Sequence, residues 1–262
     1  MATPPSIRTV GTASFGTAAT LAPAVPTHSA DDILLCIVGS SANASVTPTH
    51  SMPGDWTSVG TNANTTGTIR ARCSVFWKRT AGGEANPTVT LTPTAATACH
   101  HSAVIHSIQN CIKAGDPTEG TNTNQVAANS VIALTMTTST DDTLGILSAH
   151  HSDNVATGVT DDNTYGSRIA TDNATGIDGF LAVRDKTLSG AAGSGKGATV
   201  TFTSGGTGVG VAGVVTALKP IPPLTVGELM VATQTSRLTQ VSFARVSKVI
   251  ASGIVPGKVN AP

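Results

Sequence analysis

The chain has 262 residues, and its 15 basic and 15 acidic side chains give a formal net charge of zero. Charged residues make up 11 % of the sequence, less than half of the share in an average soluble domain. A chain without surplus charge lacks the electrostatic attraction that drives binding to nucleic acid or to an anionic membrane. We therefore expect neither partner, and no stretch of the sequence reaches the ~18 apolar residues that a membrane span requires.

The first residues and the cysteines indicate in which cellular compartment the chain is synthesised. Met1–Ser6 has no basic segment that leads into an apolar one, so we expect no secretory signal and synthesis in the cytoplasm. Cytoplasmic synthesis favours buried free thiols, with one or two disulfides as the alternative. The spacing of the four cysteines excludes a zinc ribbon; they are Cys36, Cys73, Cys99 and Cys111.

Strand patterns recur along the chain, whereas no long helical stripe with capping residues is present. The predicted strands, in chain order, are Ile7–Phe15, Ile33–Gly39, Thr57–Thr61, Ile69–Arg79, Thr88–Thr92, His100–Gln109, Ser130–Met136, Thr143–His150, Ser167–Thr171, Gly179–Arg184, Ala198–Thr203 and Gly208–Leu218. Their number and the turns between them predict an all-β, antiparallel β-sandwich of a jelly-roll-like kind.

Two segments of the chain resemble each other. Asp31-Asp32 and Asp141-Asp142 each lead into a nearly continuous apolar run, which is typical of a central strand that is covered on both faces. The similarity predicts that the two halves contribute equivalent strands to two sheets.

A proline-rich segment, 218–223, marks a domain boundary, because three prolines in four positions cannot continue a central strand. We expect a β-sandwich domain over residues 1–219 and a linker with an extended C-terminal arm over 220–262. About forty residues are too few for a core of their own, so the arm is expected to pair with the domain or with a neighbouring subunit. A partly disordered tail is the alternative. The expected assembly residues are Arg237, Leu238, Gln240, Val241, Phe243 and Arg245.

Four motifs occur in an order that resembles a group of phage and phage-like virion proteins: Asp32–Leu35, Pro53–Trp56, Ser74–Arg79 and Pro87–Leu91. In that group they belong to β-sandwich modules of tail fibres, collars and capsid decorations. The resemblance covers roughly residues 6–219. In the arm, 236–241 and 244–249 resemble the Arg-Val-Thr-Gln strand repeats of some phage structural proteins.

The chain departs from that group at two places. Asn110-Cys111-Ile112 stands where a Gly-Val-Asp-like turn is usual, and the aromatic residue expected in the preceding strand is replaced around His106. The resemblance implies a non-enzymatic virion component without a cofactor, which forms a homo-oligomer and binds other virion proteins. A host surface glycan is a further candidate partner.

A glycine-rich segment, Gly190–Lys196, matches the first seven positions of a phosphate-binding P-loop. The eighth position should be Ser or Thr and is Gly197. The following residues, 198–203, predict a strand instead of the helix whose N-terminus would bind phosphate. We expect a hairpin loop.

Histidines come in two groups, His100, His101 and His106, and then His150 and His151. On a strand, His100 and His106 face one side and His101 the other. A zinc site would need three or four converging ligands, which the spacing does not demand. We expect these histidines to be exposed or to lie at an interface.

The remaining candidates are paired aspartates and tryptophans. The aspartate pairs, which include Asp161-Asp162, fall at predicted turns, where a carboxylate caps the local backbone. We expect no catalytic dyad, because neighbours on a strand face opposite ways. Trp77 is expected in the core. Trp56, in a turn, is the candidate glycan contact of an alternative adhesin function, with packing as the simpler role.

Overall fold

The computed structural model describes residues 3–43, 46–65, 68–93, 99–127, 130–152, 158–173, 179–203 and 210–223. These residues form seventeen β-strands and contain no α-helix, which confirms the all-β class. Within the same ranges, no helix exists that is long and apolar enough to cross a membrane.

The first half of the chain forms a large and a small antiparallel sheet. Its strands are β1 (Ser6–Val10), β2 (Ser14–Gly16), β3 (Thr20–Leu21), β4 (Ile33–Asn43), β5 (Thr49–Ser51), β6 (Thr57–Asn64), β7 (Ile69–Arg79), β8 (Val89–Thr92) and β9 (Cys99–Gln109). The large sheet has the order β1-β9-β4-β7-β6, and β2 also pairs with β9. The small sheet has the order β3-β8-β5.

The second half builds the same two kinds of sheet. Its strands are β10 (Thr118–Ala127), β11 (Val131–Leu134), β12 (Thr143–His151), β13 (Gly158–Asp161), β14 (Gly166–Asn173), β15 (Gly179–Leu188), β16 (Ala198–Thr203) and β17 (Val211–Leu218). The large sheet has the order β10-β17-β12-β15-β14, and the small sheet has the order β11-β16-β13.

The strand orders of the two halves are the same, position by position. Local contacts repeat as well: Lys78 of β7 forms an ion pair with Asp55, just before β6, and Lys186 of β15 donates to Asn163 and Thr164, just before β14. The structure thus confirms that the two halves contribute equivalent strands to two sheets. The domain therefore contains an internal structural repeat.

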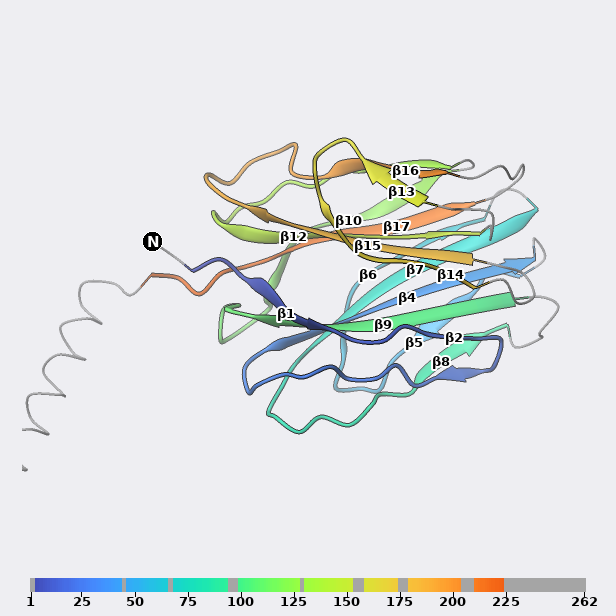
Figure 1. Cartoon of the computed structure of the whole chain (residues 1–262), viewed down its shortest axis with the longest axis horizontal. Helices are drawn as coiled ribbons and strands as arrows, with labels where there is room; N and C mark the ends of the chain where they lie inside the picture. The colour runs from blue at the N-terminus through green and yellow to red at the C-terminus, as the bar shows by residue number, and fades with distance from the viewer. Residues whose placement is uncertain are drawn as a thin grey trace, which may run out of the picture. The chain divides into compact units, whose positions relative to one another are not determined.

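The four sheets pack as four layers (Figure 1), with the two large sheets face to face in the middle. A central apolar core, which includes Ile33, Ile37 and Ile146, fills the space between the large sheets. Each small sheet covers the outer face of its own large sheet, and two further apolar clusters fill those spaces. Because β4, β9, β12 and β17 are covered on both faces, their residues are almost continuously buried instead of alternating with exposed ones. The packing confirms the β-sandwich; the jelly-roll connectivity is not confirmed.

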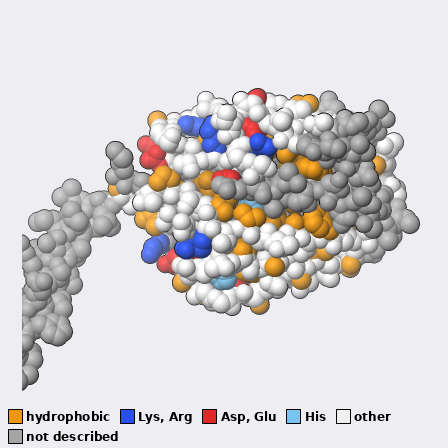
Figure 2. Space-filling model, in the orientation of Figure 1, with side chains coloured by type: hydrophobic (Ala, Val, Ile, Leu, Met, Phe, Trp, Pro, Cys, Tyr) orange, Lys and Arg blue, Asp and Glu red, His pale blue; other side chains and the backbone are white. Residues whose placement is uncertain are grey.

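The face shown in Figure 2 presents hydrophobic side chains in a band across its middle, at the level between the two large sheets, and charged side chains near one end. The charged side chains at the described turns include Asp31, Lys113 and Asp142, which are at least partly exposed. The flank of the sandwich is therefore less polar than its end.

The equivalence of the two Asp-Asp segments is shifted by one residue relative to the sequence match. The match aligns Ile33 with Thr143, but the side chain of β12 that faces the central core as Ile33 does is Leu144. The positive φ angles, 69° at Asp31 and 53° at Asp142, show the same shift. Side chains alternate between the two faces of a strand. A shift of one residue therefore decides which side chains enter the central core and which enter the outer cluster.

Several predicted boundaries differ from the structure. The strand expected over Ile7–Phe15 is interrupted at Gly11, whose N–H donates to the carbonyl of Ile105 at 2.7 Å. A Cβ at this position would lie 2.8 Å from the carbonyl oxygens of Ala24 and Ile105, so only glycine fits. The strands β3, β5, β10 and β13 were not predicted, because β10 and β13 are rich in polar residues and the other two are very short.

All four cysteines are free and buried, which confirms the expectation of reduced thiols. Burial raises the pKa of Cys73 to about 12, so this thiol stays protonated and acts as a small apolar side chain. Trp77 is half-buried against the central core, as its strand position predicted.

The chain divides into two compact units, Met1–Ile221 and Pro222–Pro262. The first ends two residues beyond the expected boundary. Its last residues lie beside its first: Ile221 forms a β-bridge with Thr3, and Pro220 forms one with Cys111. Of the expected arm, every residue from position 224 onward lies outside the described ranges.

Candidate functional site

Five side chains and one carbonyl form a row of hydrogen bonds between the first small sheet and its large sheet. We call this row the histidine–serine chain. It consists, in order, of Thr61, Ser74, His50, Ser40, His101 and the carbonyl oxygen of Pro93. Its members come from β6, β7, β5, β4 and β9, and Pro93 follows β8. The row therefore connects both layers at one place.

The distances are those of good hydrogen bonds. Ser40 Oγ lies 2.6 Å from His101 Nδ1 and 2.7 Å from His50 Nε2. Ser74 Oγ lies 2.9 Å from His50 Nδ1 and 3.0 Å from Thr61 Oγ1. His101 Nε2 lies 2.9 Å from the carbonyl oxygen of Pro93.

When both imidazoles are neutral, the carbonyl of Pro93 fixes the direction of every bond in the row, because it can only accept. His101 Nε2 must donate to it, so Nδ1 of a neutral His101 accepts from the Ser40 hydroxyl. The Ser40 oxygen then accepts from Nε2 of His50, and His50 Nδ1 accepts from Ser74, which accepts from Thr61. With both imidazoles neutral, all five side chains are satisfied.

Burial favours that neutral state. The loss of solvation lowers the pKa of His50 well below its usual value, and the positive charge of Arg72 and the neighbouring His101 lower it further. Burial also lowers the pKa of His101, although its bond to the Pro93 carbonyl acts in the opposite direction. At neutral pH the row therefore carries no charge.

The Ser40–His101 pair has the spacing of a nucleophile and its base, but its surroundings favour a different role. Both residues are fully buried, and the Ser40 oxygen already accepts a hydrogen bond from His50. A nucleophile needs an accessible lone pair. The arrangement fits a polar link between two layers.

A second polar contact joins the two halves of the domain at His150. Its Nε2 lies 2.9 Å from Ser41 Oγ of β4, and its ring stacks on His100 with 6.5 Å between centroids. Two glycines make room for the ring. A Cβ at Gly39 would lie 2.3 Å from His150 Nδ1, and a Cβ at Gly179 would lie 2.6 Å from His150 Cε1.

The expectation that the histidines are exposed or at an interface is wrong. His100, His101, His106, His150 and His151 all have no exposed surface. They lie near the ends of β9 and β12, which the neighbouring layers cover on both faces. The predicted opposite orientation of neighbouring histidines is confirmed: His101 faces the small sheet and His100 faces the second half. Within the described ranges, no group of three His, Cys, Asp or Glu side chains is placed to hold a metal ion.

A groove of about 760 Å³ lies on the second half. It runs beside β11 and β16, and the loop after β13 lines it through Asp162 and Asn163. Its lining is formed by Gly120, Ala133, Leu134, Thr135, Met136, Thr137, Asp162, Asn163, Ser194, Gly195, Gly197, Ala198 and Thr199. The glycine-rich segment thus contributes to one wall, and it leads into the strand β16 as the sequence predicted.

The aspartate pairs cap backbone amides, as their turn positions predicted. Asp141 accepts from the amide of Ala192 at 2.6 Å, and Asp142 accepts from the amide of Gly190 at 3.0 Å. Asp162 accepts from the amide of Thr199 at 2.8 Å. These carboxylates hold the glycine-rich segment and the start of β16 in place.

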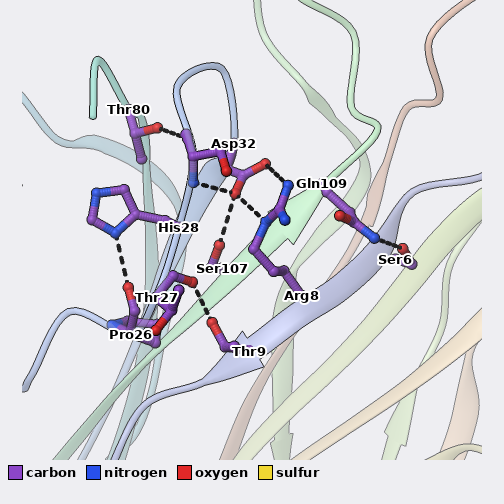
Figure 3. Close-up of polar contacts among 11 residues, drawn as sticks. Ser6, Arg8, Thr9, Pro26, Thr27, His28, Asp32, Thr80, Ser107 and Gln109 are labelled. Carbon is purple, nitrogen blue, oxygen red and sulfur yellow. Dashed lines mark hydrogen bonds and ion pairs between the residues drawn. The ribbon is translucent and has the colours of Figure 1, made fainter. Parts of the chain in front are cut away.

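Asp32 is the centre of a further polar cluster, at the end of the domain where its termini meet (Figure 3). It accepts from Arg8 Nε at 2.6 Å, from the amide of Ser29 at 2.8 Å and from Ser107 Oγ at 3.2 Å. The Asp32 side chain is 5 % exposed, so these bonds replace its water. They connect the edge strand β1, the turn before β4 and the end of β9.

Of the predicted site residues, the structure describes Trp56. Trp56 is half-buried, and it packs against the apolar cluster under the first small sheet. The six expected assembly residues, between positions 237 and 245, lie outside the described residues. The sequence reasoning missed His50, Ser40 and Ser74. The one signal for them was a Ser-Ser pair inside an otherwise apolar buried run at 33–42.

Comparison with known proteins finds no matching family model, no similar curated protein and no similar solved structure. A function for this chain is therefore argued from the contacts within its own structure.

Proposed function

We propose that this chain is a non-enzymatic structural protein of a phage particle, a decoration, collar or fibre component, which assembles with itself and with other virion proteins. In this proposal the sandwich domain is a rigid body, and the segment from position 224 onward is the assembly arm. The arm adds a strand to an open sheet edge of a neighbouring copy, where unpaired amides and carbonyls are available.

The observation that carries the proposal is the closure of the domain at Ile221. Every described strand finds its partners within residues 3–221, and Ile221 itself is fixed by a bond from its amide to the carbonyl of Asn110 at 3.1 Å. The described strands of the sandwich therefore pair with one another. In this proposal the segment from position 224 onward is available to pair with a neighbouring copy.

The charges of the chain support an attraction between the arm of one copy and the domain of another. Residues 224–262 hold four of the 15 basic side chains and one of the 15 acidic ones. The rest of the chain therefore has 11 basic and 14 acidic side chains. A positive arm and a negative domain attract each other at low ionic strength, and salt weakens that attraction.

The test compares the solution mass of the full chain with that of residues 1–221. We expect an oligomer of the full chain and a folded monomer of the shorter one. A full-length variant with Leu238→Asp, Val241→Asp and Phe243→Asp should also be monomeric. If all three proteins have the same oligomeric state, the arm does not mediate assembly.

A glycan-binding adhesin module is the second candidate function. It is supported by Trp56, which is partly exposed after the Pro53-Gly54-Asp55 turn. An exposed aromatic ring offers a face on which a sugar can stack.

A further inference from the structure

The groove on the second half has the chemistry of a binding site for a neutral, hydroxyl-rich ligand. Its rim carries hydroxyl groups from Thr135, Thr137, Ser194 and Thr199, and Leu134, Met136 and Ala198 supply buried apolar surface beneath them. A lining of this kind, mostly uncharged and with alternating polar and apolar groups, matches the two faces of a sugar ring. The volume of about 760 Å³ lies within the range of about 300–1,000 Å³ for small-molecule sites.

The walls of the groove are held in place by hydrogen bonds among the residues that surround it. Asn163 Nδ2 donates to the carbonyl of Gly197 at 2.8 Å, and the Lys196 amide donates to the carbonyl of Met136 at 3.2 Å. The Tyr165 hydroxyl donates to the carbonyl of Lys196. A site whose walls are fixed in advance loses little conformational entropy when a ligand binds.

Asp162 is the one ionisable side chain among the lining residues. Its bonds from the backbone amide and the side chain of Thr199 lower its pKa, so it is an anion at neutral pH. A carboxylate can accept about four hydrogen bonds, and it therefore has capacity for ligand hydroxyls beyond its bonds to Thr199. Its charge repels phosphates and carboxylates, which rules against the nucleotide that the glycine-rich segment would otherwise suggest.

The corresponding place in the first half is built differently. Tyr165, just before β14, corresponds to Trp56, just before β6. Tyr165 is buried beneath the groove, whereas Trp56, together with Val25 and Met52, packs as a partly exposed apolar group. The two halves therefore differ in the side chain that stands just before the edge strand, although their strand orders agree.

From these observations we propose that the groove beside β11 and β16 binds a short neutral oligosaccharide, with Asp162 as the acceptor for a pair of sugar hydroxyls. The hydroxyl groups of Thr137 and Ser194, which also line the groove, supply further hydrogen bonds. This site is separate from Trp56, and it does not depend on the virion role or on the C-terminal arm. Without an aromatic ring in the lining, the expected dissociation constant is in the millimolar range.

The test is NMR titration of the full-length, ¹⁵N-labelled protein with four probes. Maltotriose, cellotriose and triacetylchitotriose are the neutral probes, and sialyllactose is the acidic one. We expect at least one neutral probe to shift the amide signals of Thr135, Gly195 and Thr199 in a saturable way, and sialyllactose to bind at least fivefold more weakly.

Two variants and two controls separate the outcomes. Asp162→Asn keeps the shape and should weaken binding about tenfold, because a hydrogen bond to a charged group is worth more than one to a neutral group. Thr135→Trp, at an exposed position, should fill the groove and abolish binding. Asp116→Asn and Trp56→Ala should leave the affinity unchanged. If no neutral probe shifts these signals, if Asp162→Asn has no effect, or if Trp56→Ala removes the binding, the groove is not a saccharide site.

Discussion

The two halves of the domain share one strand order but use different side chains at corresponding places. The first half ties its small sheet to its large sheet with a buried row of histidine and serine hydrogen bonds. The second half fills the same kind of interface with apolar side chains, among them Leu147, Phe180 and Phe202. The comparison teaches that the order of strands depends on which positions are buried, whereas the chemistry of the buried side chains is free to diverge.

The largest expected effect that separates the halves is acid sensitivity. Burial lowers the pKa of His100 to about 4, and it lowers the pKa values of His50, His101 and His150 as well. In the unfolded chain these histidines take up protons below about pH 6.5. In the folded protein they stay neutral at that pH, because their pKa values are lower. The free energy of unfolding should therefore be constant above neutral pH. As the pH falls from about 6.5 to 4, it should decrease by up to about 1.4 kcal/mol per pH unit for each histidine.

Hydrogen exchange at falling pH would show where this loss begins. Three of these four histidines belong to the first half, so β5, β8 and β9 should lose amide protection before β12 and β17. His100→Phe should reduce the pH dependence, because it removes one imidazole whose pKa is lowered by burial. The fold should tolerate this change, because neither ring nitrogen of His100 has a hydrogen-bond partner within the described part of the chain. A loss of protection at the same pH in both halves would show that they unfold as one unit.

The contact between the halves at His150 gives the next largest effect. Gly39→Ala forces a methyl group into the imidazole ring, and overpacking of this kind costs typically 1–3 kcal/mol. The double variant Gly39→Ala, His150→Ala should cost less than the sum of the two single variants, because the clash then disappears. Chemical denaturation measures all three. Gly54→Ala is the matched control, since a Cβ there meets nothing within 4 Å; additive single effects would refute the contact.

How far the sequence predicts the structure can be judged from single strands. The apolar runs after Asp32 and Asp142 predicted β4 and β12 and their equivalence, because a strand that is covered on both faces has no polar alternation. The polar strand β10 carries no such signal, and its place comes from pairing with β17. The one-residue shift between the halves was not predictable either, since an Asp-Asp pair offers two registers for one turn.

The candidate sites were less predictable than the fold, because they depend on residues far apart in the sequence. The histidine–serine chain brings Ser40 to His101, which lies 61 residues away, and the groove joins segments of β11, the loop after β13 and the glycine-rich segment. His101 appeared exposed from its sequence, because nothing local shows that a second sheet covers its strand.

The smallest expected effect compares the turns that begin the two central strands. Asp32→Asn removes the ion pair with Arg8 and weakens two further bonds in a buried cluster, so it should lower the free energy of unfolding by about 2 kcal/mol. Asp142→Asn weakens one bond to the amide of Gly190 at a more exposed turn and should cost less than about 0.5 kcal/mol. Thermal unfolding of both variants checks the ranking. Equal losses would mean that the Asp32 cluster is no more important than an ordinary turn.

The closure at Ile221 has a mechanical consequence. The residues that follow it are attached to β17, which lies between β10 and β12 in the middle of its sheet. A pull on them along the axis of β17 loads the hydrogen bonds to both neighbours at the same time, in shear, instead of opening them one by one. The bridges of Pro220 and Ile221 to Cys111 and Thr3 would be the first to break. The strands of the sandwich would separate only at a higher force.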